Sequence, residues 1–246
     1  MFVDFSKDMS KGSVAEGIEL LYKKNEINDV TTLTSVFDRG TQSDPRLDLA
    51  FDYLGYLGTP TRTAEQIKKE LYELACYQRL SCGPTQSNIG VSGLDKNVGK
   101  AMDIVEDLIF NAQPDTAILA GLKSDIFKSR SDSKLSQRAC FSALQKYLFY
   151  GPEFIRNTTL TNEQIAALTS DELLQAVRDL YTKRHDILYY GPSDETTAKN
   201  MIAEHHKISE NPEPLERIHP QARQVTSSEV FIAPYDANQF YYLQYS

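Results

Sequence analysis

Two β-rich runs, residues 17–25 and 30–40, are followed directly by an amphipathic helix. Apolar residues partly alternate with polar ones in both runs, and a short polar segment joins them, so the sequence predicts an antiparallel pair of strands. Asp44 and Pro45 are typical of a helix N-cap and first helical position, and Gly58 suits a left-handed C-terminal cap. The order strand, strand, helix predicts a fold of the α+β class.

Further helices and strands follow along the chain. Thr63 and Gln66 have the spacing of a capping box and predict a helix that runs to about Tyr77. The helical pattern of residues 115–150 fits one long helix or two, and Gly151-Pro152 ends it. The other expected elements are hairpin strands 79–82 and 87–94, helices 97–111, 161–168 and 170–180, a buried strand 186–191, and a helix capped by Ser193 that ends at His206.

Prolines interrupt this alternation near the C-terminus and predict three units. Residues 1–210 form one α+β domain, and residues 211–220, with three prolines, form an extended linker. Residues 221–246 contain two apolar, tyrosine-rich runs, 230–235 and 239–245. We expect these runs to be the opening strands of a following domain that is truncated in this sequence.

Composition excludes several classes of protein. The 246 residues are 41% hydrophobic, enough for a core, and carry 26 basic against 34 acidic side chains, a net charge of −8. This charge disfavours binding to nucleic acid and to anionic membranes. No apolar run approaches the roughly 20 residues of a membrane span, and the N-terminus lacks a signal-peptide pattern. Cytoplasmic and periplasmic or secreted locations of a longer parent protein both stay open.

One face of the helix before Thr59 carries Leu49, Asp52 and Tyr53. A metallopeptidase helix places two histidines four residues apart on one face, where both bind one zinc ion beside a catalytic glutamate. Leucine offers no lone pair, and one carboxylate with one phenol is a poor substitute for two imidazoles. We therefore expect no metal site, no catalytic residue and no cofactor site in this segment.

The other residues that could carry chemistry match no known pattern. The three cysteines have spacings of neither a zinc site nor a disulfide framework, and no Gly-x-Ser-x-Gly elbow or phosphate-binding loop occurs. His205 and His206 diverge by about 100° on a helix, so they predict a solvated helix end. His185 and His219 are isolated, which predicts structural or exposed side chains.

The order of elements resembles one domain of the pitrilysin-like zinc peptidases, the superfamily of insulinase and the mitochondrial processing peptidase. The similarity covers about residues 14–208 and is clearest in residues 20–59, which end in Leu57-Gly58-Thr59, and in the late strand 187–192. Active domains carry His-x-x-Glu-His shortly before such an ending. Counting back, the resemblance implies that Leu49 and Tyr53 stand at the histidine positions and Asp52 at the glutamate position. The third ligand, a glutamate, is also missing, because no glutamate occurs between Glu106 and Glu153.

The resemblance implies an antiparallel-rich sheet covered by helices on one face, and a degenerate, non-catalytic domain of a longer peptidase. Such a domain closes a chamber around peptide substrates, while zinc is held by a catalytic half on the same polypeptide or on a homologous subunit. Peptides add to a sheet edge in active domains, and here the hairpin 79–94 or the strand 30–39 is the expected edge. The alternatives are a stand-alone interaction or assembly subunit that kept the fold, and an unrelated α+β binding module.

Overall fold

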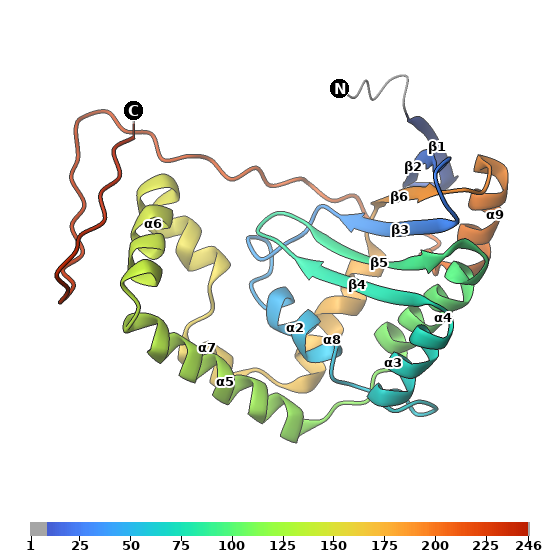
Figure 1. Cartoon of the computed structure of the whole chain (residues 1–246), viewed down its shortest axis with the longest axis horizontal. Coiled ribbons are helices and arrows are strands. Elements are labelled where there is room, and N and C mark those ends of the chain that lie inside the picture. Colours follow the sequence, from blue (N-terminus) through green and yellow to red (C-terminus); the bar gives the residue numbers. More distant parts are fainter. Residues whose placement is uncertain (1–8, 246) are drawn as a thin grey trace.

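The computed structural model describes residues 9–245 and contains one six-stranded sheet with helices packed against it (Figure 1). The strands are β1 (Ser10–Ala15), β2 (Ile18–Lys24), β3 (Val30–Phe37), β4 (Cys76–Cys82), β5 (Ser87–Leu94) and β6 (His185–Gly191). The helices are α2 (Leu47–Leu54), α3 (Ala64–Glu73), α4 (Asp95–Asn111), α5 (Thr116–Lys134), α6 (Gln137–Thr158), α7 (Asn162–Ala167), α8 (Ser170–Arg178), the 3-10 turn η1 (Asp179–Thr182) and α9 (Glu195–His205). None of the helices in the described part of the chain is both long and apolar enough to cross a bilayer.

The strand order is β1-β2-β6-β3-β5-β4, and only the β2–β6 pair is parallel. The predicted antiparallel pairing of residues 17–25 with 30–40 is therefore wrong, because β6 lies between β2 and β3. The connection between β2 and β3 crosses the end of β6, where the Asn25 N–H donates to the Gly191 carbonyl oxygen (2.7 Å). A local pattern cannot predict that a strand from much later in the chain inserts there.

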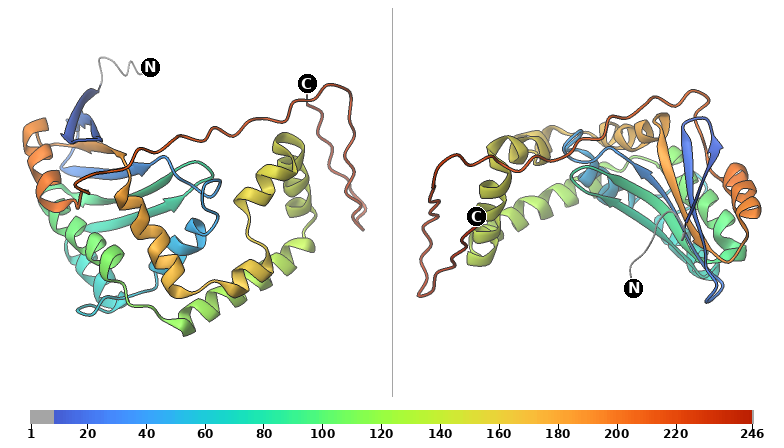
Figure 2. Two further views of the ribbon diagram at one scale, coloured as in Figure 1. Left: turned by 180° about the vertical axis from the view of Figure 1, so that it is seen from behind. Right: turned by 90° about the horizontal axis from the view of Figure 1, so that it is seen from above.

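Side chains alternate between a buried and an open face of the sheet. In β3, Leu33 and Phe37 are fully buried, whereas Thr32 and Thr34 point to the opposite, partly exposed face. Helices cover the buried face, and the other face stays uncovered by helices (Figure 2). The expected mainly antiparallel α+β architecture with helices on one face is confirmed.

The largest contribution to the core comes from α4, whose apolar stripe packs against β3, β4 and β5. Six of its apolar side chains at helical spacing are buried, namely Val98, Ala101, Met102, Val105, Leu108 and Ile109. Full burial of one large aliphatic side chain stabilises a fold by about 1.5–3 kcal/mol, so this one stripe fixes α4 on the sheet.

Several element ends differ from the predictions. The N-cap of α2 is Arg46, and Asp44 instead accepts the Arg46 backbone N–H and pairs with its guanidinium (2.8 Å). This helix ends at Leu54, before Gly58. The capping box of Thr63 and Gln66 is confirmed, but α3 ends at Glu73, because Ala75 takes a left-handed conformation (φ 51°) that turns the chain into β4.

Other predicted helix ends, caps and turns agree with the structure in part. Residues 115–150 form two helices, α5 and α6, and Gly151 breaks the helical conformation with φ 76°. The cap of α9 is Asp194, one residue after the predicted Ser193. The hairpin of β4 and β5 closes as predicted, with the Gly83 N–H donating to the Gln86 carbonyl (2.8 Å).

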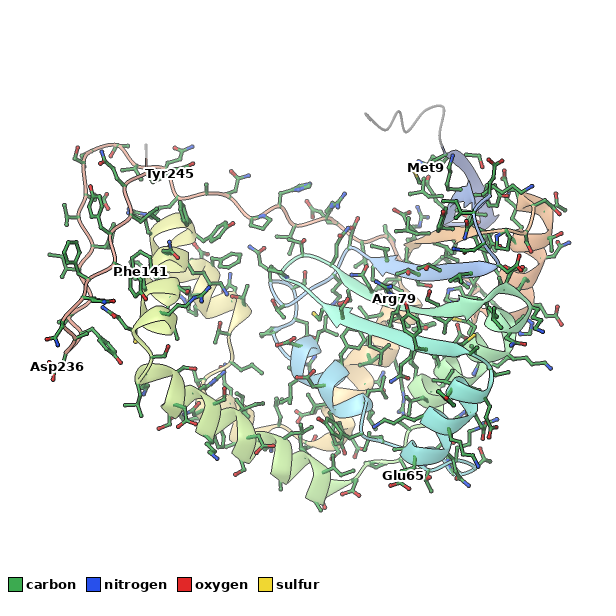
Figure 3. The ribbon with its side chains drawn as sticks, viewed as in Figure 1. Met9, Glu65, Arg79, Phe141, Asp236 and Tyr245 are labelled. Atoms are coloured by element: carbon green, nitrogen blue, oxygen red, sulfur yellow. The ribbon has the colours of Figure 1, made fainter. Side chains whose placement is uncertain are left out.

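The segment after α9 leaves the sheet and reaches α6, which stands apart from the sheet at the other end of the molecule (Figure 1). The strands expected at 230–235 and 239–245 are not formed: residues 214–245 contain no helix or strand. Instead their aromatic side chains lie against α6, with ring centroids 5.2 Å apart for Phe141 and Tyr241 and 5.8 Å apart for Tyr147 and Phe231 (Figure 3). A strand needs a partner for its backbone groups, and no described strand is adjacent to these runs.

Candidate functional site at helix α2 and strand β4

The three residues of α2 that the sequence singled out, Leu49, Asp52 and Tyr53, do not lie on one face of the helix. Leu49 (6% exposed) and Tyr53 (0% exposed) point into the core, where α2 packs against α8. Asp52 is exposed on the adjacent face of the helix. The structure therefore brings Leu49 and Tyr53 together and separates them from Asp52.

The Tyr53 hydroxyl joins three elements. It accepts the N–H of Asp115 (2.7 Å), and it lies 2.9 Å from the Asp115 carbonyl oxygen and 2.9 Å from Ser170 Oγ. Asp115 is the N-cap of α5, and Ser170 is the first residue of α8. A phenol at this position thus connects α2 to the starts of both helices inside the core.

These residues do not fit a zinc ion. Leu49 has no donor atom, and every hydrogen-bonding direction of the Tyr53 hydroxyl is directed at protein groups. Lys128 and Lys134, at the two ends of the α5 region where the resemblance implies the third ligand of an active domain, are exposed. In residues 9–245 no three His, Cys, Asp or Glu side chains are grouped to hold a metal ion.

Asp52 lines a shallow cleft of about 360 Å³ beside the edge of the sheet. Its walls come from α2, α3 and β4, and the lining residues are Phe51, Asp52, Gly55, Tyr56, Lys68, Gln78 and Leu80. Desolvation and the nearby Asp48 raise the pKa of the Asp52 carboxyl. The Lys68 ammonium lies 5.9 Å from the centroid of the Tyr56 ring, and Gln78 Oε1 is buried without a hydrogen-bond partner among the described residues. The cleft offers polar groups for binding but no nucleophile paired with a base.

Strand β4 forms one wall of this cleft and is the last strand of the sheet. It pairs with β5 on one side, and within residues 9–245 no strand pairs with its other side. Its exposed positions Tyr77, Arg79 and Ser81 alternate with partly buried ones (Figure 3 labels Arg79). The second expected edge, residues 30–39, is not free, because β3 pairs with β5 and β6.

The core contains a buried polar cluster that the sequence did not predict. His206 is 5% exposed, so its predicted place at a solvated helix end is wrong, whereas His205 bonds Asp103 on the surface (2.9 Å). His206 contacts Glu106 and the structural His185, both also buried. One signal was present in the sequence: Glu106 stands four residues after Met102, on the apolar face of α4.

Comparisons with known proteins give structural similarity only. No family model matches the chain, and no curated protein matches its sequence. Among solved structures, it is similar to a peptidase M16 inactive domain from Pseudomonas fluorescens (TM-score 0.70, 14% identity, 87% of this chain, 54% of that one). It is also similar to the periplasmic protease PqqL from Escherichia coli (0.72, 18%, 91% and 25%). A third similar structure is the ferredoxin protease FusC in complex with Arabidopsis ferredoxin (0.73, 10%, 89% and 25%).

The chain therefore has the fold of a peptidase M16 domain, as the resemblance to the pitrilysin-like peptidases implied. It spans about half of the first of these proteins and a quarter of the other two.

Proposed function

We propose that this chain is a non-catalytic domain that helps to enclose peptides in the chamber of a zinc metalloendopeptidase. One observation supports the proposal: in a fold shared with a peptidase M16 inactive domain, Leu49 and Tyr53, which the resemblance places at the two histidine positions, are buried side chains. Zinc and the general base then belong to the catalytic half of the parent protein. This segment cleaves nothing on its own.

The unpaired edge of β4 is the proposed contact for the peptide. An extended peptide that adds to a sheet edge gains main-chain hydrogen bonds irrespective of its sequence. The adjacent cleft supplies a carboxylate and an ammonium, from Asp52 and Lys68. These groups can receive the side chains of a bound peptide.

The C-terminal part of the chain is the proposed link to the partner half. Residues 211–220 act as the linker, and residues 221–246 belong to a following domain. In support, Val230, Ile232 and Phe240 are 84%, 83% and 86% exposed, a degree of exposure that calls for a covering surface. The catalytic half of the same polypeptide, or a homologous subunit, supplies that surface.

The peptide contact can be tested by NMR with an unstructured peptide and the purified chain. We expect amide shift changes confined to β4 and to the α2 and α3 residues of the cleft, with the peptide left intact. A control peptide methylated at alternate backbone nitrogens keeps its side chains but loses edge donors. We expect the methylated peptide to bind at least about 10-fold more weakly, because it loses one or two hydrogen bonds to the strand edge.

Two results contradict this proposal. Equal binding of both peptides excludes strand addition, and shift changes centred on another surface exclude β4 as the site. Cleavage of the peptide by the purified chain, or one tightly held zinc per molecule in metal analysis, refutes the non-catalytic assignment itself.

The second candidate is a stand-alone assembly subunit, and the exposed apolar side chains after residue 224 favour it equally. The open reading frame separates the two. A His-x-x-Glu-His motif in the same or in a neighbouring reading frame supports the peptidase domain, whereas its absence from both supports the assembly subunit.

A further inference from the structure

Three buried polar side chains from different elements form a hydrogen-bonded triad in the core. Glu106 comes from α4, His185 begins β6, and His206 follows the last turn of α9. His206 Nδ1 lies 2.5 Å from Glu106 Oε1, and the two Nε2 atoms of His206 and His185 are 2.8 Å apart. The exposed fractions are 1% for Glu106 and 5% for each histidine, so water does not replace these bonds.

The partners determine where the protons are. His185 Nδ1 faces the Lys183 carbonyl oxygen (3.0 Å), an acceptor only, so Nδ1 carries a proton and donates it. Nε2 of a neutral His185 is then an acceptor, and His206 Nε2–H donates to it. The remaining contact, between His206 Nδ1 and Glu106, holds a single proton between an imidazole and a carboxyl group. The triad thus holds three protons, and with that number all its hydrogen-bonding groups are satisfied wherever the two shared protons lie, whereas a fourth proton leaves two donors facing each other.

The triad lies beneath the segment by which the chain leaves the sheet, residues 206–213, here termed the strap. The Lys207 N–H donates to Glu106 Oε2 (2.8 Å). At its other end, the Glu213 N–H donates to the Thr182 carbonyl (2.9 Å) and the Glu213 carbonyl accepts the Arg184 N–H (2.8 Å). The strap is thus fixed to α4 at one end and to the start of β6 at the other.

Few other charged groups face the triad. From η1, the buried Tyr181 ring lies 5.6 Å from the His206 ring, and its hydroxyl has no bonding partner in the described residues. The Lys207 ammonium lies over the Phe110 ring of α4 (4.4 Å), and Lys183 pairs with Glu213. β3 contributes the apolar Phe37, 4.5 Å from the His185 ring. Among residues 9–245, no carboxylate apart from Glu106 is hydrogen-bonded to either histidine ring of the triad, so a second positive charge there has no counter-ion.

We propose that the triad is an acid-sensitive latch for the strap. When His185 takes up a proton from solvent, the triad holds a fourth proton, and N–H groups then oppose each other at the two Nε2 atoms, 2.8 Å apart. The two rings separate, Glu106 loses its fixed partner, and residues 206–213 are released from α4 and β6. Acid thereby frees the connection between this domain and whatever follows it in the chain.

The direction of the pH effect follows from burial. Burial, and then the neighbouring His206, lower the pKa of His185 to about 4, below the 6.5 of an ordinary histidine. A histidine with a lowered pKa in the closed state stabilises that state above pH 6.5 and loses this contribution as the pH falls towards 4. Protonation of His185 by itself multiplies the opening equilibrium by about 20 between pH 7 and pH 5.

Amide hydrogen exchange of the full chain tests the latch. The reporters are the N–H groups of Lys207 and Glu213, measured at pH 7 and pH 5 and corrected for intrinsic exchange. The test variant is His185→Gln, whose amide can still donate to the Lys183 carbonyl and accept from His206 but does not titrate. We expect opening of the strap to increase about 20-fold more in the native chain than in this variant. The matched control, His205→Gln, removes the surface histidine and keeps the native response.

Equal pH responses of the native chain and His185→Gln refute the latch. It is also refuted if amides of the β3–β5 pairing show the same response, because the molecule then unfolds as a whole. If His185→Gln does not fold, ¹⁵N NMR of the imidazole nitrogens in the native chain tests the latch instead. A neutral His185 with its proton on Nδ1 at pH 6, titrating below pH 5, supports the latch, and titration near pH 6.5 overturns it.

Discussion

Tyr53 has a structural role inside the core. The resemblance places a metal-binding histidine at this position, and the phenol there is completely buried and bonded to Asp115 and Ser170. Because these groups are inside the core, each needs its partner. The position is therefore constrained by packing and by these hydrogen bonds.

We predict that Tyr53→Phe destabilises the chain by about 1–3 kcal/mol, because the Asp115 N–H and Ser170 are left unpaired in the core. Urea unfolding followed by circular dichroism measures the change. Tyr56→Phe is the control: this ring is 54% exposed and its hydroxyl has no recorded bond among the described residues, so we expect a change within about 0.5 kcal/mol. Equal effects of the two substitutions would contradict the role assigned to Tyr53.

A second prediction concerns Cys82. Burial raises the pKa of its thiol to about 11, and the thiolate is the form that reacts with alkylating reagents. We expect labelling of Cys82 by iodoacetamide to increase about tenfold per pH unit from pH 8 to pH 10, as the thiolate fraction rises. Peptide mapping by mass spectrometry measures the rate at each pH. A rate that levels off at pH 9 would show an ordinary thiol.

At the scale of single residues, the sequence predicted the chemical character of a position better than its hydrogen-bonding partners. The apolar character of Leu49 and the missing ligands could be read directly. The burial of His206 could not, because its neighbour His205 is on the surface and the bonding partner Glu106 is 100 positions away. Buried polar groups are paired through tertiary contacts, which local spacing does not encode.

At the scale of elements, the hairpin of β4 and β5 and the stripe of α4 were predictable because a turn and a helical period are local signals. The position of β6 between β2 and β3 was not, because its pairing partners lie 150 to 167 residues earlier in the chain. The same holds for the edge: only the complete strand order distinguishes the free β4 from the doubly paired β3.

The capping box of α3 allows a prediction at this scale. The Thr63 hydroxyl accepts the Gln66 N–H (3.2 Å), and the Gln66 side chain accepts the Thr63 N–H (2.7 Å). We expect Thr63→Ala to reduce the free energy of unfolding by about 1 kcal/mol, the usual loss for a removed N-cap. Thr196→Ala is the matched control, an exposed threonine inside α9, where alanine is the better helix former. Thermal or urea unfolding compares the two, and a loss in the control as large as in α3 would exclude a capping effect.

At the scale of the whole molecule, the sheet and the helices packed on it form one body, whereas the C-terminal segment is held mainly by contacts with α6 (Figure 2). Two further contacts are the ion pair of Arg217 with Asp38 and the hydrogen bond from the Tyr235 hydroxyl to the Leu135 carbonyl. Aromatic contacts and the bond from Arg223 N–H to the Phe149 carbonyl (2.7 Å) hold this segment in place. Segments with few backbone hydrogen bonds open at low cost, whereas a central strand opens only when the sheet unfolds. The boundary between these two regimes lies where the strap ends, at Glu213.

This boundary predicts the course of limited proteolysis. Arg217 lies just beyond the strap with a side chain 52% exposed, whereas Arg79, although exposed, is part of β4 and is held by pairing with β5. We expect trypsin to cut after Arg217 before it cuts β4, and mass spectrometry of the early products to identify a body that ends near residue 217. A chain shortened to residues 1–217 provides the control. Its midpoint of urea unfolding should equal that of the full chain. The reason is that, among the described residues beyond the strap, only Leu215 packs against the core, and it is partly buried there. Resistance of the C-terminal segment to trypsin, or a clear loss of stability on its removal, would mean that residues 218–246 are an integral part of this domain and that the proposed linker is not a boundary.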